Sequence, residues 1–138
     1  MYQKDYILRL IEQIGDLIRG IFGLIKNGNF EQARQKLDDL YYEVLKEDAA
    51  FFSVIPEDKI TQKLLIEHNY TNGHLEILAK LLFAESELAL ATGYRSESLE
   101  YSRKSLTLLA FIDSEYKLYS QERLDTMEKI RERIKELS

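Results

Sequence analysis

A chain of 138 residues, of which 45% are hydrophobic and 31% charged, can bury a sizeable core in one domain and is too polar for a membrane protein. Its formal net charge of -5 provides no basic field for a phosphate backbone, so nucleic acid is not an expected partner. The chain has no cysteine, no signal-peptide pattern and no stretch of ~20 apolar residues, so we expect a cytoplasmic protein with no disulfide and no membrane contact.

Apolar residues recur at helical spacing from one end of the chain to the other. One proline, six glycines and no alternation of period two leave little material for a sheet. The pattern predicts an all-α fold of about five to six antiparallel helices. No linker rich in Pro, Gly or Ser divides it, so residues 1–138 are expected to form a single domain.

The first predicted helix runs from about Gln3 to Lys26 and ends at Asn27-Gly28-Asn29. Asn29 is expected to cap a second helix, with Gln32 as its capping-box partner, so that the two helices form a hairpin. One face of the first helix carries a continuous apolar stripe: Ile7, Leu10, Ile11, Ile14, Leu17, Ile18, Ile21, Leu24 and Ile25.

Three glycines, Gly15, Gly20 and Gly23, lie inside this first helix. Each costs about 1 kcal/mol relative to alanine, so another interaction should offset them. Close packing of a second helix is the first interpretation. A hinge, or a backbone surface open to a partner peptide, is the alternative.

The middle of the chain is less regular. Beyond Asp48 the helical pattern weakens, and Pro56 is expected to begin a short helix that ends near Asn69. Asn72-Gly73 predicts the next turn. A strongly apolar helix then extends to Thr92, before Gly93, and should be the most buried helix of the fold.

Two further helices complete the prediction, one over about 96–112 and a last one capped by Asp113 or Ser114. The last helix should direct six side chains inward: Tyr116, Tyr119, Met127, Ile130, Ile134 and Leu137. The final four have the spacing of a coiled-coil seam. They predict either packing within the chain or a homodimer interface.

The segment Gly28-Asn29-Phe30-Glu31-Gln32-Ala33 resembles the turn and second-helix start of a tetratricopeptide repeat. After Gly93, Ser98 and Ser105 stand where a second repeat would have small residues, whereas Leu40 and Glu85 depart from the motif. The whole chain also resembles an uncharacterised family of short bacterial helical proteins of unknown function. That second resemblance supports the fold but implies no activity. The resemblance to tetratricopeptide repeats implies stacked helical hairpins and a non-enzymatic module that binds a protein or peptide.

Aromatic side chains are the first candidates for binding that partner, because they often anchor protein interfaces. Adjacent residues on a helix cannot both face the core, so Tyr42 rather than Tyr41 should be exposed. Phe51 and Phe52 either bind the partner or fill the gap between the hairpins. The candidate partner-binding residues are therefore Tyr42, Phe51 and Phe52.

The alternative function is a helical domain that binds a small molecule or a metal near His68, His74 and Glu85. Two imidazoles six residues apart could hold a metal, although only Glu67 and Glu76 are near enough in sequence to add a ligand. A carboxylate on the apolar face either acts as an acid or base, or pairs with Lys or Arg, which would argue against this alternative. No set of catalytic residues and no cofactor motif is recognisable, so we expect no enzyme and no cofactor.

Overall fold

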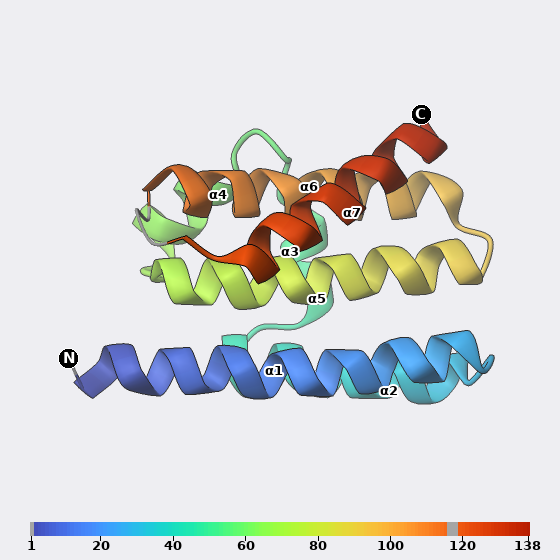
Figure 1. Ribbon diagram of the computed structural model, residues 1–138, viewed down its shortest axis with the longest axis horizontal. Coiled ribbons are helices and arrows are strands. Elements are labelled where there is room, and N and C mark those ends of the chain that lie inside the picture. Colours follow the sequence, from blue (N-terminus) through green and yellow to red (C-terminus); the bar gives the residue numbers. More distant parts are fainter. Residues whose placement is uncertain (1, 116–118) are drawn as a thin grey trace.

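The computed structural model describes residues 2–115 and 119–138, and these residues form the all-α fold that the sequence predicts (Figure 1). They contain seven α-helices and two π-helical turns, η1 and η2. In chain order the elements are α1 (Tyr2–Lys26), α2 (Phe30–Leu40), η1 (Tyr41–Leu45), α3 (Ala49–Ser53), α4 (Ile60–Gln62), η2 (Lys63–Glu67), α5 (Asn72–Ala91), α6 (Arg95–Glu115) and α7 (Gln121–Leu137). Within the described ranges, none of these helices has both the length and the apolar character of a membrane span.

Two long antiparallel hairpins, α1–α2 and α5–α6, make up most of the fold. They pack through α1 and α5, which lie side by side and run in the same direction (Figure 1). α7 packs across α6 on the side of the molecule that faces the viewer in Figure 1. The short elements α3, α4 and η2 connect the hairpins, and α4 contacts α6.

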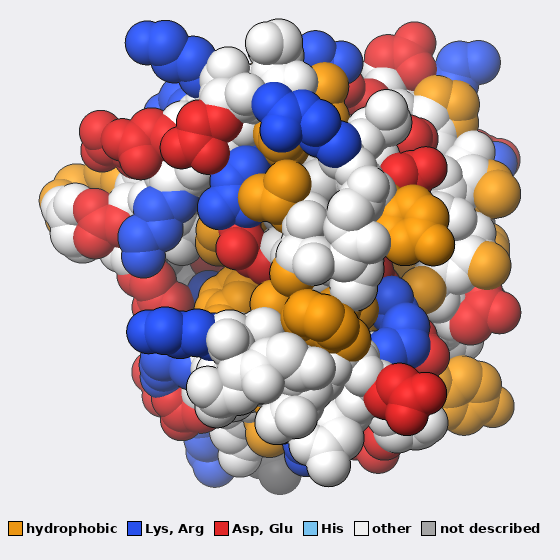
Figure 2. Space-filling view, turned by 90° about the vertical axis from the view of Figure 1, so that its right-hand side faces the viewer, with side chains coloured by type: hydrophobic (Ala, Val, Ile, Leu, Met, Phe, Trp, Pro, Cys, Tyr) orange, Lys and Arg blue, Asp and Glu red, His pale blue; other side chains and the backbone are white. Residues whose placement is uncertain are grey.

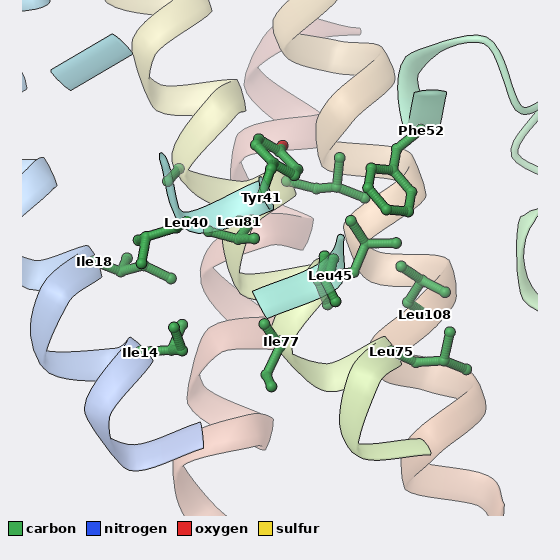
Figure 3. Packing of buried hydrophobic residues seen from close by; sticks show 14 of the residues in the cluster. Ile14, Ile18, Leu40, Tyr41, Leu45, Phe52, Leu75, Ile77, Leu81 and Leu108 are labelled. Carbon is green, nitrogen blue, oxygen red and sulfur yellow. The ribbon is translucent and has the colours of Figure 1, made fainter. Parts of the chain in front are cut away.

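The core is centred on α5, as expected from its apolar sequence, because α5 contacts α1, α2, η1 and α6. Figure 3 shows side chains from α1, from the α2–η1 segment and from α5 meeting in the core. Ser98 and Ser105 of α6 are fully buried and let α6 approach α5 closely. Their hydroxyls donate to the carbonyls of Ser86 and Ala79 on α5, at 2.8 and 2.7 Å.

A buried lysine fastens the connection between the hairpins to α6. Lys104 is fully buried, and its Nζ donates to the carbonyl of Ser53, the last residue of α3, at 2.7 Å. Glu100 lies 3.5 Å from the same ammonium group. A buried ammonium is costly unless it is paired and hydrogen-bonded, and here it has both a carbonyl and a carboxylate. The end of α3 is therefore held against α6.

The start of the first hairpin's second helix differs from the prediction. Asn29 precedes α2 but makes no side-chain cap hydrogen bond, so the expected capping box with Gln32 is absent. The short helix expected at Pro56 begins only at Ile60. An unpredicted helix, α3, starts after Asp48, whose carboxylate accepts a hydrogen bond from the backbone of Phe51.

The boundaries of the later helices also needed correction. Asn72-Gly73 is not a turn but the start of α5, because Thr71 provides the cap. α6 continues to Glu115, so Asp113 and Ser114 lie inside it, and Ser120 caps α7 instead. Tyr119 precedes that cap and is 75% exposed rather than directed inward, whereas Tyr116 lies outside the described residues.

The last helix uses its coiled-coil-like seam within the chain. Met127 and Ile130 are buried, and Ile134 packs partly against the same core. α7 is also tied to α5 by an ion pair between Arg133 and Glu87, with 2.6 Å between Nη1 and Oε1. A homodimer cannot use Met127 and Ile130 while α7 keeps this position.

The glycines of α1 lack the close packing that was their first interpretation. A methyl group at Gly20 or Gly23 would meet nothing within 4 Å, and one at Gly15 would meet only the ends of two side chains, at 3.9 and 4.0 Å. Glycine therefore lowers the helix propensity of α1 at Gly20 and Gly23 without a packing benefit. The remaining interpretations are a hinge and a backbone surface open to a partner.

We expect Gly20→Ala and Gly23→Ala each to raise the free energy of unfolding by about 0.5–1 kcal/mol, because alanine restricts the unfolded chain and favours the helix. Urea denaturation followed by circular dichroism measures the effect. Gly28→Ala is the matched control and should lower stability, because Gly28 has a φ of 79°. A loss of stability in Gly20→Ala would contradict the open surface.

Candidate functional site

The structure separates the three predicted partner-binding residues. Tyr42 is 70% exposed and its neighbour Tyr41 is buried, which confirms the orientation expected from helical period. Phe51 is half-buried. Phe52 is 0% exposed and stacks on Tyr41 with 5.8 Å between ring centroids, so its place at a binding surface must be corrected to a place in the core.

Phe51 and Phe52 belong to an aromatic cluster that also contains both histidines of the chain. Phe51 contacts Phe52 edge to face at 5.1 Å and lies 4.9 Å from the ring of His68. Tyr70 contacts His68 at 4.7 Å, stacks on His74 at 4.9 Å, and lies 6.3 Å from Phe52. Candidates for two different functions, partner binding and metal binding, therefore meet around Tyr70.

This cluster lies where the two π-helical turns come together. The hydroxyl of Tyr70, which follows η2, donates at 2.5 Å to the carbonyl of Leu45, the last residue of η1. Lys46 and Asn69, just beyond the two turns, adopt left-handed conformations with φ of 61° and 58°. Both π turns and left-handed residues other than glycine are uncommon and occur often at functional sites.

We call the contacts of Leu45, Glu47, His68, Tyr70 and His74 the π-turn junction. His68 Nε2 lies 3.2 Å from the Glu47 carboxylate. His74 Nδ1 instead accepts a hydrogen bond from the backbone of the capping residue Thr71, at 3.0 Å. Within residues 2–115 and 119–138, no three His, Cys, Asp or Glu side chains are placed to hold a metal ion together.

Glu85 lies elsewhere, in an ion pair. It is 3% exposed, and its two oxygens accept hydrogen bonds from both terminal nitrogens of Arg34, at 2.5 and 2.8 Å. Burial alone would lower the pKa of Arg34, but its bonds to Glu85 and Asp38 raise it. A carboxylate held in this way is paired with a cation in a fixed two-pronged geometry.

Glu85 also shapes the environment of Tyr41. Burial, and then the negative charge of Glu85, raise the pKa of Tyr41 well above its usual value. His74 and Glu85 stand eleven residues apart on the same helix, which separates them by about 16 Å along its axis. The structure does not bring His68, His74 and Glu85 into one pocket, and the pairing of Glu85 with arginine argues against the alternative function.

A second candidate site is a cleft between α1 and α7, above the surface of α5. Its volume is about 290 Å³. Phe22 of α1 and Phe83 of α5 contact each other edge to face at 5.6 Å and form its apolar part. The other lining residues are charged: Glu87, Lys129, Glu132, Arg133 and Glu136. We call this site the α1–α7 cleft.

Sequence reasoning did not identify this cleft. Phe22 lies beside the main apolar stripe of α1, and Phe83 widens the stripe of α5, so neither has a pattern of its own. Figure 2 shows the end of the molecule at which the α1–α2 and α5–α6 turns lie, where hydrophobic, positive and negative side chains are intermixed. A concentrated patch of one kind does not mark this end of the molecule.

Comparison of the chain with protein families, with curated proteins and with solved structures found no match.

Proposed function

We propose that this chain is a non-enzymatic interaction module, similar to tetratricopeptide-repeat proteins, which binds a protein or peptide in the α1–α7 cleft. The observation that carries the proposal is the half-buried Phe22–Phe83 pair, which is open to solvent between two helices. α1 and α5 run parallel, as the first helices of successive repeats do, and α7 borders the same face (Figure 1). In repeat proteins such a face is the binding surface.

The chemistry of the cleft supports a peptide rather than a small cofactor. Its apolar part is small, and its border carries both signs of charge, with Lys129 and Glu132 on successive turns of α7. An apolar centre with a polar rim is the usual composition of a protein interface. We infer that one apolar side chain of the partner packs on the two phenylalanines while polar groups of the partner contact the rim.

Two ion pairs connect α7 to α5 at the cleft and beside it. The Arg133–Glu87 ion pair joins α7 to α5 within the lining, and Lys80 of α5 bonds Glu122 at the start of α7, at 2.9 Å. A hydrogen bond from the Lys80 side chain, and then the positive charge of the same lysine, lower the pKa of Glu122. A surface that is already ordered loses less conformational entropy on binding. This arrangement favours recognition of a short segment without rearrangement of the helices.

The test is capture of partners from the native cell lysate, with quantitative mass spectrometry, followed by titration calorimetry with the captured protein. Phe22→Ala should weaken binding by about 30-fold, the usual effect at a central aromatic residue. Glu132→Lys changes the rim without touching the core and should also reduce affinity. Tyr42→Ala is the matched control on a different element and should bind as the unmodified chain does.

The possible outcomes distinguish a wrong location of the binding surface from a wrong function. A partner lost in Tyr42→Ala but retained by both cleft variants would support a binding module and move its site to η1. Failure to retain any specific partner would remove support from the interaction module itself. Circular dichroism of each variant must show an unchanged fold, because Phe22 also packs against the core.

A further inference from the structure

The π-turn junction contains the only two histidines of the chain, on either side of one tyrosine. The Tyr70 ring is edge-on to His68 and nearly parallel to His74, with an interplanar angle of 16°. Its hydroxyl holds the end of η1 through Leu45. Tyr70 thus connects η1, the segment after η2 and the first turn of α5, and the imidazole of His74 belongs to the side-chain type that changes charge near neutral pH.

His74 accepts a backbone hydrogen bond at the start of α5, which requires an Nδ1 without a proton. Its Nδ1 accepts the backbone N–H of Thr71 at 3.0 Å and also lies 2.8 Å from the Thr71 hydroxyl, which in turn accepts the backbone N–H of His74 at 3.3 Å. This reciprocal pair is a capping box in which histidine replaces the usual Glu or Gln. A proton on Nδ1 removes the acceptor for the Thr71 N–H. It also places a positive charge in the first turn of α5, where the helix dipole disfavours cations.

His68 lies on the other side of Tyr70 and has a different contact, because its Nε2 is 3.2 Å from the Glu47 carboxylate. It takes no part in the capping box of α5.

The other groups around His74 do not titrate in the same range or are paired elsewhere. Burial, with a contribution from Glu47, raises the pKa of Tyr70 to about 12, so the phenol keeps its proton. The adjoining α3 (Ala49–Ser53) carries no charge and contributes aromatic contacts. Glu76, the next carboxylate on α5, lies 3.7 Å from Arg123 of α7. Glu47, in the loop after η1, is the carboxylate that contacts His68 in the junction.

We propose that the π-turn junction is a pH-sensitive latch: protonation of His74 undoes its capping box with Thr71 and loosens residues 70–75 at the start of α5. The buried side chains of Ile60 and Leu64 keep the rest of the connection in place, so the change is local. The latch does not depend on the α1–α7 cleft.

The direction of the pH dependence follows from the folded state. Burial lowers the pKa of His74 below its ordinary value of 6.5, so the open form binds the proton more tightly than the closed form does. The closed form is therefore fully favoured above pH 6.5. Its stability relative to the open form is lost as the pH falls from 6.5 towards the pKa of His74 in the closed form.

Hydrogen exchange of the full chain at pH 7.5 and 5.5, corrected for the intrinsic pH dependence of exchange, tests the latch. The opening constant of amides in 70–75 should rise about fivefold at the lower pH, the usual effect of losing a helix cap, while amides of α6 stay unchanged. In His74→Gln the response should disappear, because a glutamine amide oxygen accepts the Thr71 N–H at either pH. His68→Gln should keep the response.

Equal protection at both pH values in the unmodified chain would overturn the proposal, as would a full response in His74→Gln. Because the first of these outcomes is measured on the unmodified chain, the test does not depend on whether His74→Gln folds. Nitrogen chemical shifts of the His74 ring at pH 7.5 should identify the tautomer with its proton on Nε2. A proton on Nδ1 at that pH is incompatible with the capping box and would also overturn the latch.

Discussion

Arg34→Met should lower the free energy of unfolding by about 3–5 kcal/mol, because it leaves the buried carboxylate of Glu85 without its cation. Glu85 is almost completely enclosed and accepts two hydrogen bonds from Arg34. The methionine side chain preserves the packing of the aliphatic part of Arg34. The loss of stability therefore reports the uncompensated charge rather than a cavity. Urea denaturation monitored by circular dichroism at pH 7 measures it.

Two further variants show whether the stability loss of Arg34→Met comes from the uncompensated charge or from altered packing. Arg34→Met combined with Glu85→Gln removes both charges and should recover most of the lost stability, since an uncharged amide costs far less to bury. Arg34→Lys keeps the charge but not the two-pronged geometry, and should fall between Arg34→Met and the unmodified chain. If Arg34→Met costs less than about 1 kcal/mol, Glu85 is not dependent on this partner, and its burial needs another explanation.

Phe52→Ala should also destabilise the chain by about 3–5 kcal/mol, which is the usual result of removing a fully buried aromatic ring. Phe52 contacts the rings of Tyr41, Phe51 and Tyr70, and therefore joins α3 to η1 and to the segment between η2 and α5. The cavity would lie among these rings, which are fixed by other contacts and cannot all collapse into it. Denaturant midpoints and slopes, compared between the two proteins, give the difference.

Tyr42→Ala provides the contrast, because Tyr42 is exposed on the same chain segment and should change stability by no more than about 0.5 kcal/mol. The pair therefore separates a core aromatic residue from a surface one, although both were candidates for the same role. A small effect of Phe52→Ala, comparable to that of Tyr42→Ala, would mean that the ring is not enclosed in solution.

The helical repeat of apolar residues carries most of the information that made the fold predictable. It located the long helices, the burial of α5 and the different orientations of Tyr41 and Tyr42, because a period of 3.6 residues links sequence directly to one face of a helix. It did not predict the π turns, since a single turn closed by i→i+5 bonds barely changes that pattern. Asn72-Gly73 was misplaced because local turn propensity was outweighed by the Thr71 cap.

The candidate sites were less predictable, because they depend on how separate helices meet. The sequence placed Glu85 on an apolar face but could not select Arg34, fifty-one residues away, as its partner. It placed His68 and His74 around a turn but not Tyr70 between them. The α1–α7 cleft depends on where α7 lies relative to α1 and α5. No local pattern in either helix specifies that position.

The chemical reactivity of the buried Lys104 can report how often the connection between the hairpins opens. Acylating reagents attack a lysine only when its amine is accessible and has lost its proton, whereas the ammonium of Lys104 is enclosed and bonded to Ser53. Its reactivity therefore depends on how often α3 separates from α6. The rate at which this one amine is modified, read by mass spectrometry in the unaltered chain, measures that separation directly and without any substitution.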